Sequence, residues 1–292
     1  MTRYIEAKTI LSTVKAKPDT YFGLSYNMNL YRGCQHSCIY CDSRSDCYQL
    51  GDLSDIRIKK DAIPILEREL RSKRIKGTVG FGSMNDCYMP IEQEYQLTRK
   101  ALQLMIKYKF PVHIITKSDL VTRDLDLLKE ISKIYAAVSV TITTTDDNLS
   151  KVIEPNAPVS SKRFEALQQL SSNGIYCGIT FMPVLPSITD TTENITEMVT
   201  HAADCGVKYI LPAFGLTIRD GQREYMYQQF DKHFPNLREQ YVSEFGNNYN
   251  CPSPRANELY SLFYNLCKKK RISSQMNFYR PTKPIQQKLN LE

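Results

Sequence analysis

The sequence has no long hydrophobic run and no segment depleted of apolar residues. No stretch approaches the ~20 consecutive apolar residues of a membrane-spanning helix, and the N-terminus has no apolar run of signal-peptide length. Of 292 residues, 42% are hydrophobic and 24% are charged, which disfavours a disordered or fibrous chain. We therefore expect a soluble, cytoplasmic protein that does not associate with membranes and has one large core.

The sequence also lacks the features of a disulfide scaffold, although it contains nine cysteines. Their number is odd, and in a reducing compartment metal ligation or redox chemistry explains cysteines better. The net charge of +7 is compatible with a nucleic-acid partner. The basic residues gather in three clusters, at Lys59–Lys60, Arg71–Lys76 and Lys268–Arg271. Solvated helix ends and loops are the simpler explanation of these clusters.

Strand-like and helix-like patterns alternate along most of the chain. Six strands are predicted, at residues 26–31, 77–83, 111–116, 136–143, 175–185 and 207–214. Helices are predicted at Glu92–Tyr108, Arg123–Ile134 and Ser160–Ser172, and a further one is predicted to run from a cap at Asp190 to Cys205. This alternation predicts the α/β class, with helices outside a parallel sheet. Six units are too few for a closed eight-unit barrel, so a partial (β/α)6 barrel is predicted, with an open doubly wound sheet as the alternative.

The rhythm ends after residue 214, and neither an internal repeat nor a low-complexity linker is present. Apolar residues recur at helical spacing at Leu259, Leu262, Phe263, Leu266 and Cys267. We therefore predict that residues 1–214 form the barrel with an N-terminal lead-in. Residues 215–292 are predicted to form a C-terminal helical extension packed on the barrel.

Three cysteines, Cys34, Cys38 and Cys41, lie in a C-x3-C-x2-C spacing. Thiolates are the usual protein ligands of iron–sulfur clusters, because soft sulfur suits iron in a sulfide core. Three ligands leave one iron of a four-iron cluster open to a small molecule, as a catalytic cluster requires. Tyr40, just before the third cysteine, supplies a flat apolar face beside the loop.

Other roles for the cysteines remain open from the sequence. A zinc knuckle needs a fourth ligand, such as Cys47, His36 or a distant cysteine, but zinc sites more often contain paired C-x2-C units, and no second unit exists here. A second cluster built from Cys47, Cys251 and Cys267 is disfavoured by their wide, irregular spacing.

Five segments, in this order, read YNMNLYRGCQHSCIYCDSR, SMNDCYMPIE, ITKSDLVTRDLDLL, EPNAPVSSKRFEAL and MPVLPSITD. The cysteine spacing with its preceding aromatic residue resembles the motif of the radical S-adenosylmethionine (SAM) superfamily. The flanking segments look like its spore photolyase-like branch, often labelled DNA repair photolyase. The resemblance runs from about Tyr26 to Gly206 and is weaker in the C-terminal part.

This resemblance implies a partial barrel of the radical SAM type that binds a [4Fe–4S] cluster through Cys34, Cys38 and Cys41. It also implies that SAM binds the open iron and is cleaved reductively to a 5′-deoxyadenosyl radical, which takes a hydrogen atom from the substrate. The required electron comes from a donor such as flavodoxin or ferredoxin. Sites of this kind lie at the carboxyl ends of the strands.

The resemblance assigns SAM contacts to residues that follow the predicted strands. Asn85 and Asp86 offer acceptors for an ammonium or hydroxyl group, although a turn that caps the next helix explains them equally well. Lys117 matches the TK-S segment of the family, which suits the SAM carboxylate.

Further SAM contacts are assigned to the next two strands. Ser139 and Thr141 can direct a hydroxyl towards the SAM ribose, although β-propensity alone accounts for them, Thr141 especially. Pro183, with Met182, can pack against adenine, and core packing is the alternative for both residues.

One departure from the family concerns the hydrogen donor. Spore photolyase uses a cysteine just before the segment that matches residues 83–86, and this chain has Gly82-Ser83 there. Cys87 lies nearby and is our candidate catalytic residue, with a tolerated substitution of proline as the alternative. The predicted substrate is nucleic acid, such as a DNA lesion. The alternatives are a radical SAM enzyme for a peptide or small metabolite, and a non-catalytic module stabilised by zinc or a cluster.

Overall fold

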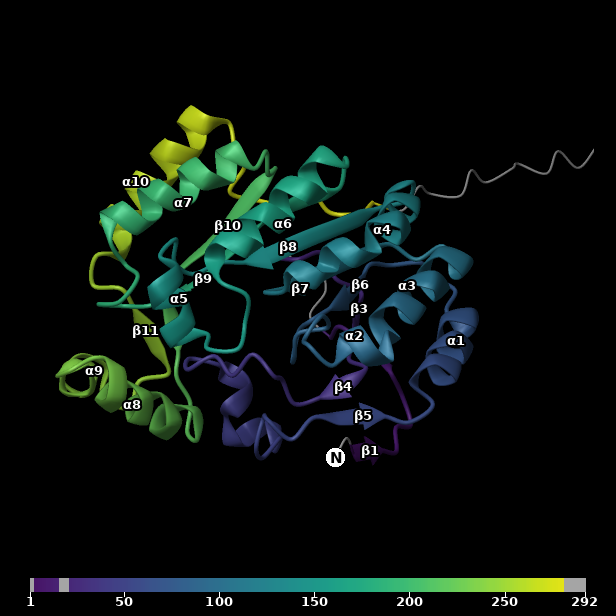
Figure 1. Cartoon of the computed structure of the whole chain (residues 1–292), viewed down its shortest axis with the longest axis horizontal. Coiled ribbons are helices and arrows are strands. Elements are labelled where there is room, and N and C mark those ends of the chain that lie inside the picture. The colour runs from purple at the N-terminus through teal and green to yellow at the C-terminus, as the bar shows by residue number, and fades with distance from the viewer. Residues whose placement is uncertain (1–2, 16–20, 281–292) are drawn as a thin grey trace, which may run out of the picture.

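The computed structural model describes residues 3–15 and 21–280 of the chain (Figure 1). Its strands are β1 (Arg3–Ile5), β2 (Leu11–Thr13), β3 (Tyr26–Met28), β4 (Tyr31–Arg32), β5 (Arg57–Lys59), β6 (Val79–Phe81), β7 (Val112–Thr116), β8 (Ala136–Thr141), β9 (Tyr176–Val184), β10 (Tyr209–Thr217) and β11 (Asn250–Pro252). Its helices are α1 (Ala62–Ser72), α2 (Glu92–Tyr95), α3 (Leu97–Tyr108), α4 (Leu125–Ser132), α5 (Asp147–Ile153), α6 (Ser160–Ser172), α7 (Thr192–Asp204), α8 (Gln222–His233), α9 (Leu237–Phe245) and α10 (Ala256–Lys270).

One sheet of eight strands organises the protein, in the order β11-β10-β9-β8-β7-β6-β3-β2. The six central strands, from β3 to β10, run parallel, whereas β2 and β11 pair antiparallel at the two edges. These six parallel strands are the six that the sequence predicts. In the described part of the chain the edge strands do not pair with each other, so the sheet is open. The predicted α/β fold with a partial barrel is thereby confirmed.

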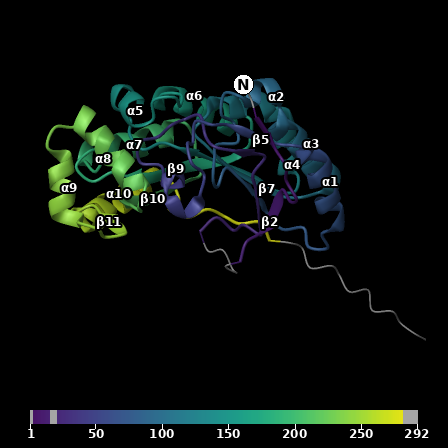
Figure 2. The same cartoon turned by 90° about the horizontal axis from the view of Figure 1, so that it is seen from below.

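The main helices cover one face of this sheet. One hydrophobic cluster joins alternate strand residues, such as Ile114, Val138 and Val140, to buried side chains of α1, α3, α4, α6, α7 and α10. Figure 2 shows the helices in an arc around the outside of the sheet, from α1 at one end to α8 and α9 at the other. Doubly wound sheets carry helices on both faces, and this sheet is not arranged in that way.

The other face of the sheet is partly polar. The Nε2 atom of His113 and the hydroxyl of Tyr209 each lie 2.7 Å from the Ser139 hydroxyl, forming a buried hydrogen-bonded chain across β7, β8 and β10. Phe22 and Met276 belong to the apolar cluster that packs around Tyr209 on this face. Loop segments rather than helices therefore line the inside of the partial barrel.

Several helix boundaries differ from those predicted; α4, for example, spans Leu125–Ser132 rather than residues 123–134. The helix predicted at residues 92–108 is divided into α2 and α3 by Gln96, whose φ of 51° is left-handed. The N-cap of α7 is Thr191, whose hydroxyl accepts a hydrogen bond from the Asn194 amide at 3.1 Å. The predicted cap, Asp190, instead accepts a hydrogen bond from the Ser253 hydroxyl at 2.6 Å.

The C-terminal region shares the main sheet. The predicted apolar stripe lies on α10, which packs against α7 and buries Leu259, Phe263 and Cys267. The region is not purely helical, because β11 pairs with β10, and the predicted boundary between residues 214 and 215 falls within β10. None of the described helices combines the length and apolar character that crossing a membrane requires.

Candidate active site

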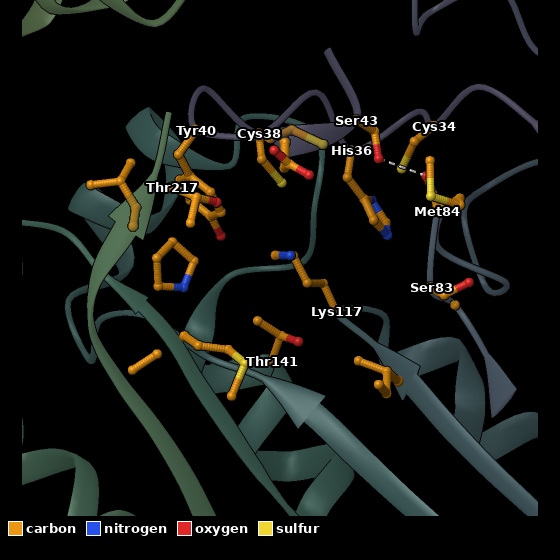
Figure 3. A pocket seen from close by; sticks show the side chains of 18 of the residues that line it. Cys34, His36, Cys38, Tyr40, Ser43, Ser83, Met84, Lys117, Thr141 and Thr217 are labelled. Atoms are coloured by element: carbon orange, nitrogen blue, oxygen red, sulfur yellow. Dashed lines mark hydrogen bonds between the residues drawn. The ribbon is translucent and has the colours of Figure 1, made fainter. Parts of the chain in front are cut away.

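A cavity of about 690 Å³ opens at the carboxyl ends of the parallel strands (Figure 3). One side is the cysteine loop, residues 34–43, together with residues 82–86 after β6 and the end of β7. The opposite side, which we call the far wall, consists of residues 213–217, Asn250–Pro252 and Tyr260. The cavity therefore joins the N-terminal cysteine loop to the C-terminal region, which is separated from it by about 210 residues in the sequence.

The cysteine loop brings Cys34, Cys38 and Cys41 to the same cavity. The backbone amide of Cys34 donates to the Leu53 carbonyl at 2.8 Å, and the Ile39 amide donates to the Ile153 carbonyl at 2.9 Å. Cys34 follows Gly33, which has a positive φ of 88° that favours glycine. A Cβ on Gly33 would lie 2.7 Å from the Leu53 carbonyl oxygen, so only glycine leaves room there. Backbone contacts with two distant segments thus fix the loop.

The three thiols face a common space without forming a site for a single metal ion. Within residues 3–15 and 21–280, no three His, Cys, Asp or Glu side chains converge as the ligands of one ion do. A four-iron cluster binds its thiolates at separate iron atoms, so it accepts ligands that are spread around a cavity. The donor set therefore fits a cluster better than a zinc ion.

Asp86 joins three segments around the cavity. Its buried carboxylate accepts hydrogen bonds from the Thr116 hydroxyl at 2.7 Å, the Lys117 amide at 2.6 Å and the Tyr88 amide at 2.8 Å, and His36 Nε2 lies 3.1 Å away. Burial alone raises the pKa of Asp86, but His36 and the hydrogen bonds outweigh it and hold the pKa well below its usual value. Asp86 lines the cavity, yet its oxygens already have protein partners.

Asn85 occupies the same turn and lines the cavity. Its side-chain amide nitrogen donates to the Tyr31 carbonyl at 2.7 Å. The Ser43 hydroxyl donates to the Met84 carbonyl at 3.0 Å, which ties this turn to the cysteine loop (Figure 3). Gly82 begins the turn with a φ of 90°, and a Cβ there would lie 2.1 Å from the Ile115 carbonyl oxygen.

Lys117 extends from the end of β7 into the cavity, between the cysteine loop and Thr141 (Figure 3). Its ammonium lies 3.9 Å from a Glu154 carboxylate oxygen and 5.7 Å from the centre of the Tyr40 ring. Burial lowers the pKa of Lys117, but the neighbouring Cys38 and Glu154 outweigh this effect, so the pKa is raised. Lys117 is thus a cation held at the cavity.

The other predicted cofactor contacts divide into two groups. Tyr40, Thr141 and Pro183 line the cavity, and the Thr141 hydroxyl is hydrogen-bonded to that of Thr180 at 2.6 Å. Ser139 does not line the cavity, because it points to the same face of β8 as Thr141 but lies two residues deeper, in the chain with His113 and Tyr209. The predicted ribose contact of Ser139 therefore lacks support.

Cys87 does not line the cavity either. Its side chain is buried in the main hydrophobic cluster, and burial raises the pKa of its thiol well above the usual value. Local hydrogen bonds keep the Cys87 side chain in the core and away from the cavity. The Tyr88 amide donates to the Asp86 carboxylate, and the Thr98 hydroxyl donates to the Cys87 carbonyl at 2.6 Å. The thiol that lines the cavity outside the cysteine loop is Cys251, on β11.

Sequence reasoning missed the far wall and a buried carboxylate. The far wall includes Phe214, Cys251 and Tyr260, which lie outside or at the edge of the recognisable segments. Glu154 belongs to the EPNAP segment, so its sequence context signalled importance without a role. Its carboxylate accepts a hydrogen bond from the Tyr40 hydroxyl and pairs with Arg163 at 2.5 Å.

Two of the three basic clusters lie away from the cavity. Arg71–Lys76 spans the end of α1 and precedes β6, and Lys268–Arg271 ends α10 close to Ser273, which bridges to Tyr209 at the start of β10. Both therefore lie towards the amino ends of the strands, opposite the cavity. Solvated helix ends account for these two clusters.

A model of the radical SAM superfamily matches residues 28–199, which is more than half of the chain and includes the cysteine loop. The chain belongs to the radical SAM superfamily. An uncharacterized protein from Methanocaldococcus jannaschii is 37% identical over 199 residues, covering 66% of this chain and 74% of that protein. Another uncharacterized relative, from Mycobacterium tuberculosis, is 27% identical over 225 residues, covering 74% of this chain and 66% of that protein.

Solved radical SAM structures share the fold. Spore photoproduct lyase in complex with a dinucleoside spore photoproduct superimposes with a TM-score of 0.68 at 15% identity, covering 91% of this chain and 78% of that one. A radical SAM methyltransferase from Kitasatospora setae gives a TM-score of 0.53 at 12% identity, and the match covers 82% of this chain and 51% of that one. At these identities the likeness concerns the fold alone.

Proposed function

We propose that this protein is a radical SAM enzyme that holds a [4Fe–4S] cluster through Cys34, Cys38 and Cys41 and binds SAM in the adjoining cavity. The observation that carries the proposal is that one short loop directs three thiols to a single cavity at the carboxyl ends of the strands. Three thiolates leave the fourth iron of such a cluster without a protein ligand. Family membership supports the same cofactors.

When bound, the cluster and SAM supply reductive cleavage to a 5′-deoxyadenosyl radical, with one electron from a donor such as flavodoxin or ferredoxin. The protein binds and orients these groups. Lys117 presents an ammonium to the SAM carboxylate, and Asn85, whose amide nitrogen is bound to Tyr31, presents its side-chain oxygen as an acceptor to the polar end of SAM. Thr141 and Pro183 line the cavity where the nucleoside part is accommodated, and the far wall restricts access of water.

We propose nucleic acid as the substrate class, on the basis of an arginine–tyrosine cluster beside the cavity. It consists of Arg44, Tyr48, Arg219, Tyr225 and Tyr249. The Arg219 guanidinium lies 5.5 Å from the Tyr48 ring centre and 4.9 Å from that of Tyr249, and Tyr48 lines the cavity. Cations interleaved with aromatic rings suit the phosphates and unstacked bases of a single strand.

Spore photoproduct lyase, whose fold this chain shares, was solved in complex with a dinucleoside spore photoproduct, which agrees with this substrate class. A peptide or small metabolite is the alternative substrate, which the mostly apolar far wall also admits.

The cofactor proposal is tested by anaerobic reconstitution with iron and sulfide. The wild type is expected to bind about four iron atoms per chain and to release 5′-deoxyadenosine from SAM under a strong reductant. The Cys38→Ala variant is expected to lose this release. Cys47→Ala is the matched control, because Cys47 is exposed and lies outside the cavity lining. The catalytic proposal fails if the wild type holds four irons yet releases no 5′-deoxyadenosine. Loss of metal from Cys47→Ala as well would favour the zinc alternative.

The substrate proposal is tested by adding single-stranded DNA, RNA or peptides to the same assay. A substrate of the right class is expected to increase 5′-deoxyadenosine release above the rate with SAM alone. Arg219→Ala is expected to weaken oligonucleotide binding and to lower its salt dependence by about one charge. Lys268→Ala, at the opposite end of the strands, is expected to leave both unchanged. Stimulation by peptides alone would favour the alternative.

A further inference from the structure

A buried group of four side chains lies beneath the cysteine loop. Glu154 follows α5, Arg163 lies on α6, Lys117 follows β7 and Tyr40 belongs to the loop. Glu154 and Arg163 are fully buried. The Glu154 carboxylate accepts the Tyr40 hydroxyl on one oxygen, which lies 3.9 Å from the Lys117 ammonium, and its other oxygen lies 2.5 Å from Arg163.

This group contains two cations and one anion. Burying an unpaired charge is strongly unfavourable. Of the two cations only Lys117 lines the cavity. The surplus positive charge therefore faces the cavity and suits a ligand with a negative group.

Arg163 cannot turn towards the cavity itself. Its Nε donates to the Pro158 carbonyl at 2.7 Å, and its Nη1 donates to the Thr141 carbonyl at 2.9 Å while it pairs with Glu154. These contacts fix the guanidinium between the segment before α6 and the end of β8. Arg163 thereby fixes the Glu154 carboxylate, which in turn contacts Lys117.

We propose that Glu154, held by Arg163, is a positioning residue that directs the Lys117 ammonium towards the carboxylate of the ligand in the cavity. The inference rests on the proposed function, because SAM is that ligand. A lysine side chain has several rotatable bonds and a strongly hydrated head. Without the Glu154 carboxylate, Lys117 keeps its charge but loses the contact that holds it in the binding geometry.

The first variant to examine removes both halves of the buried pair, as Glu154→Gln with Arg163→Met. Removing both partners of a buried ion pair costs much less stability than leaving one of them unpaired. The double variant also keeps the net charge of the group at one positive unit, because it removes one anion and one cation. A change in SAM affinity then reports the position of Lys117 rather than the total charge.

SAM affinity is measured by equilibrium binding to reconstituted protein, with iron content and urea unfolding recorded in parallel. We expect the double variant to keep about four irons and to bind SAM about tenfold more weakly, which corresponds to roughly 1.4 kcal/mol. In a Lys117→Met background the same two substitutions are expected to cause no further loss, because the effect passes through Lys117.

Additive losses in the Lys117→Met background would overturn the inference, since they would mean that the pair acts on the cavity without Lys117. A fall in iron content would also overturn it, because the pair would then support the cysteine loop. Unchanged SAM affinity in the double variant would overturn the inference as well, because Lys117 would then keep its binding geometry without Glu154. A wild type that holds its iron but does not bind SAM would instead refute the proposed function.

Discussion

The cysteine-loop end of the cavity and the far wall are held together by different forces. At the loop end, buried polar contacts join the cysteine loop to later segments: His36 Nε2 lies 3.1 Å from an Asp86 oxygen, and the Tyr40 hydroxyl donates to Glu154, which pairs with Arg163. At the far wall, Phe214 packs with its ring centre 4.4 Å from that of Tyr260, and β11 adds backbone hydrogen bonds at the sheet edge.

The difference teaches how one cavity can serve two ligands. Buried charged and hydrogen-bonded groups in a low dielectric environment impose one geometry, which suits a cofactor that is always the same. Aromatic and apolar contacts depend on shape and tolerate exchange of side chains of similar volume. The far wall is therefore the part of the cavity where related chains can change substrate without disturbing the cofactor site.

The largest effect is expected for Asp86→Asn, compared with Asp190→Asn beside the far wall. Asp86 has His36 and three hydrogen-bond donors as partners, whereas Asp190 accepts a hydrogen bond from the Ser253 hydroxyl. Loss of the Asp86 charge is expected to lower the free energy of unfolding by about 3–5 kcal/mol. The Asp190 change is expected to cost about 1–2 kcal/mol. Urea unfolding of the apo-proteins measures both free energies. Equal losses would contradict the view that buried charge matters more at the loop end than at the far wall.

An intermediate effect is expected at two glycines, one at each end of the cavity. A Cβ on Gly82 would lie 2.1 Å from the Ile115 carbonyl oxygen, and a Cβ on Gly215 would lie 2.6 Å from the Pro252 Cα. Each alanine variant is expected to lose about 3 kcal/mol, because φ is positive and the obstructing atoms are backbone. Gly51→Ala is the control, with positive φ but open space, and about 1 kcal/mol is expected there. If the losses of unfolding free energy at Gly82 and Gly215 are no larger than that of the Gly51 control, the facing backbone segments move to accommodate the added Cβ.

The smallest effect is expected for Cys87→Ala. Cys87 is buried in the main core, so loss of its sulfur is expected to cost about 1 kcal/mol in unfolding free energy. Release of 5′-deoxyadenosine is expected to stay within about twofold of the wild type, because the thiol does not reach the cavity. The same assay on Cys251→Ala compares the buried thiol of Cys87 with a thiol that lines the cavity at the far wall. A tenfold loss on Cys87→Ala alone would restore a catalytic role for that thiol.

Much of the fold was predictable because strands buried on both faces have a strong local signature. The apolar and β-branched runs of β7, β8 and β9 identify them, and α6 begins and ends at the predicted residues, Ser160 and Ser172. The cap of α7 was not predictable in this way. Asp190 and Thr191 are both good capping residues, and the choice depends on Ser253, which is distant in the sequence.

The candidate site was predictable only where a short motif carries it. The three cysteines and Lys117 come from contiguous segments with recognisable spacing, and the structure brings them to one cavity. Cys87 also lies in such a segment and Ser139 lies on a predicted strand, but their side-chain directions depend on the turn at Asp86 and on strand register, respectively. The far wall depends on the pairing of β10 with β11, for which the sequence contains no local signal.

The pairing of β10 with β11 also sets an order of events during protein synthesis. The cysteine loop emerges from the ribosome about 210 residues before Asn250–Pro252 and Tyr260. A nascent chain that ends before residue 250 carries the three thiols but lacks one side of the cavity. A cluster inserted at that stage is open to solvent and to oxygen on that side. We therefore expect cofactor loading to follow the pairing of β11 with β10, which closes that side of the cavity.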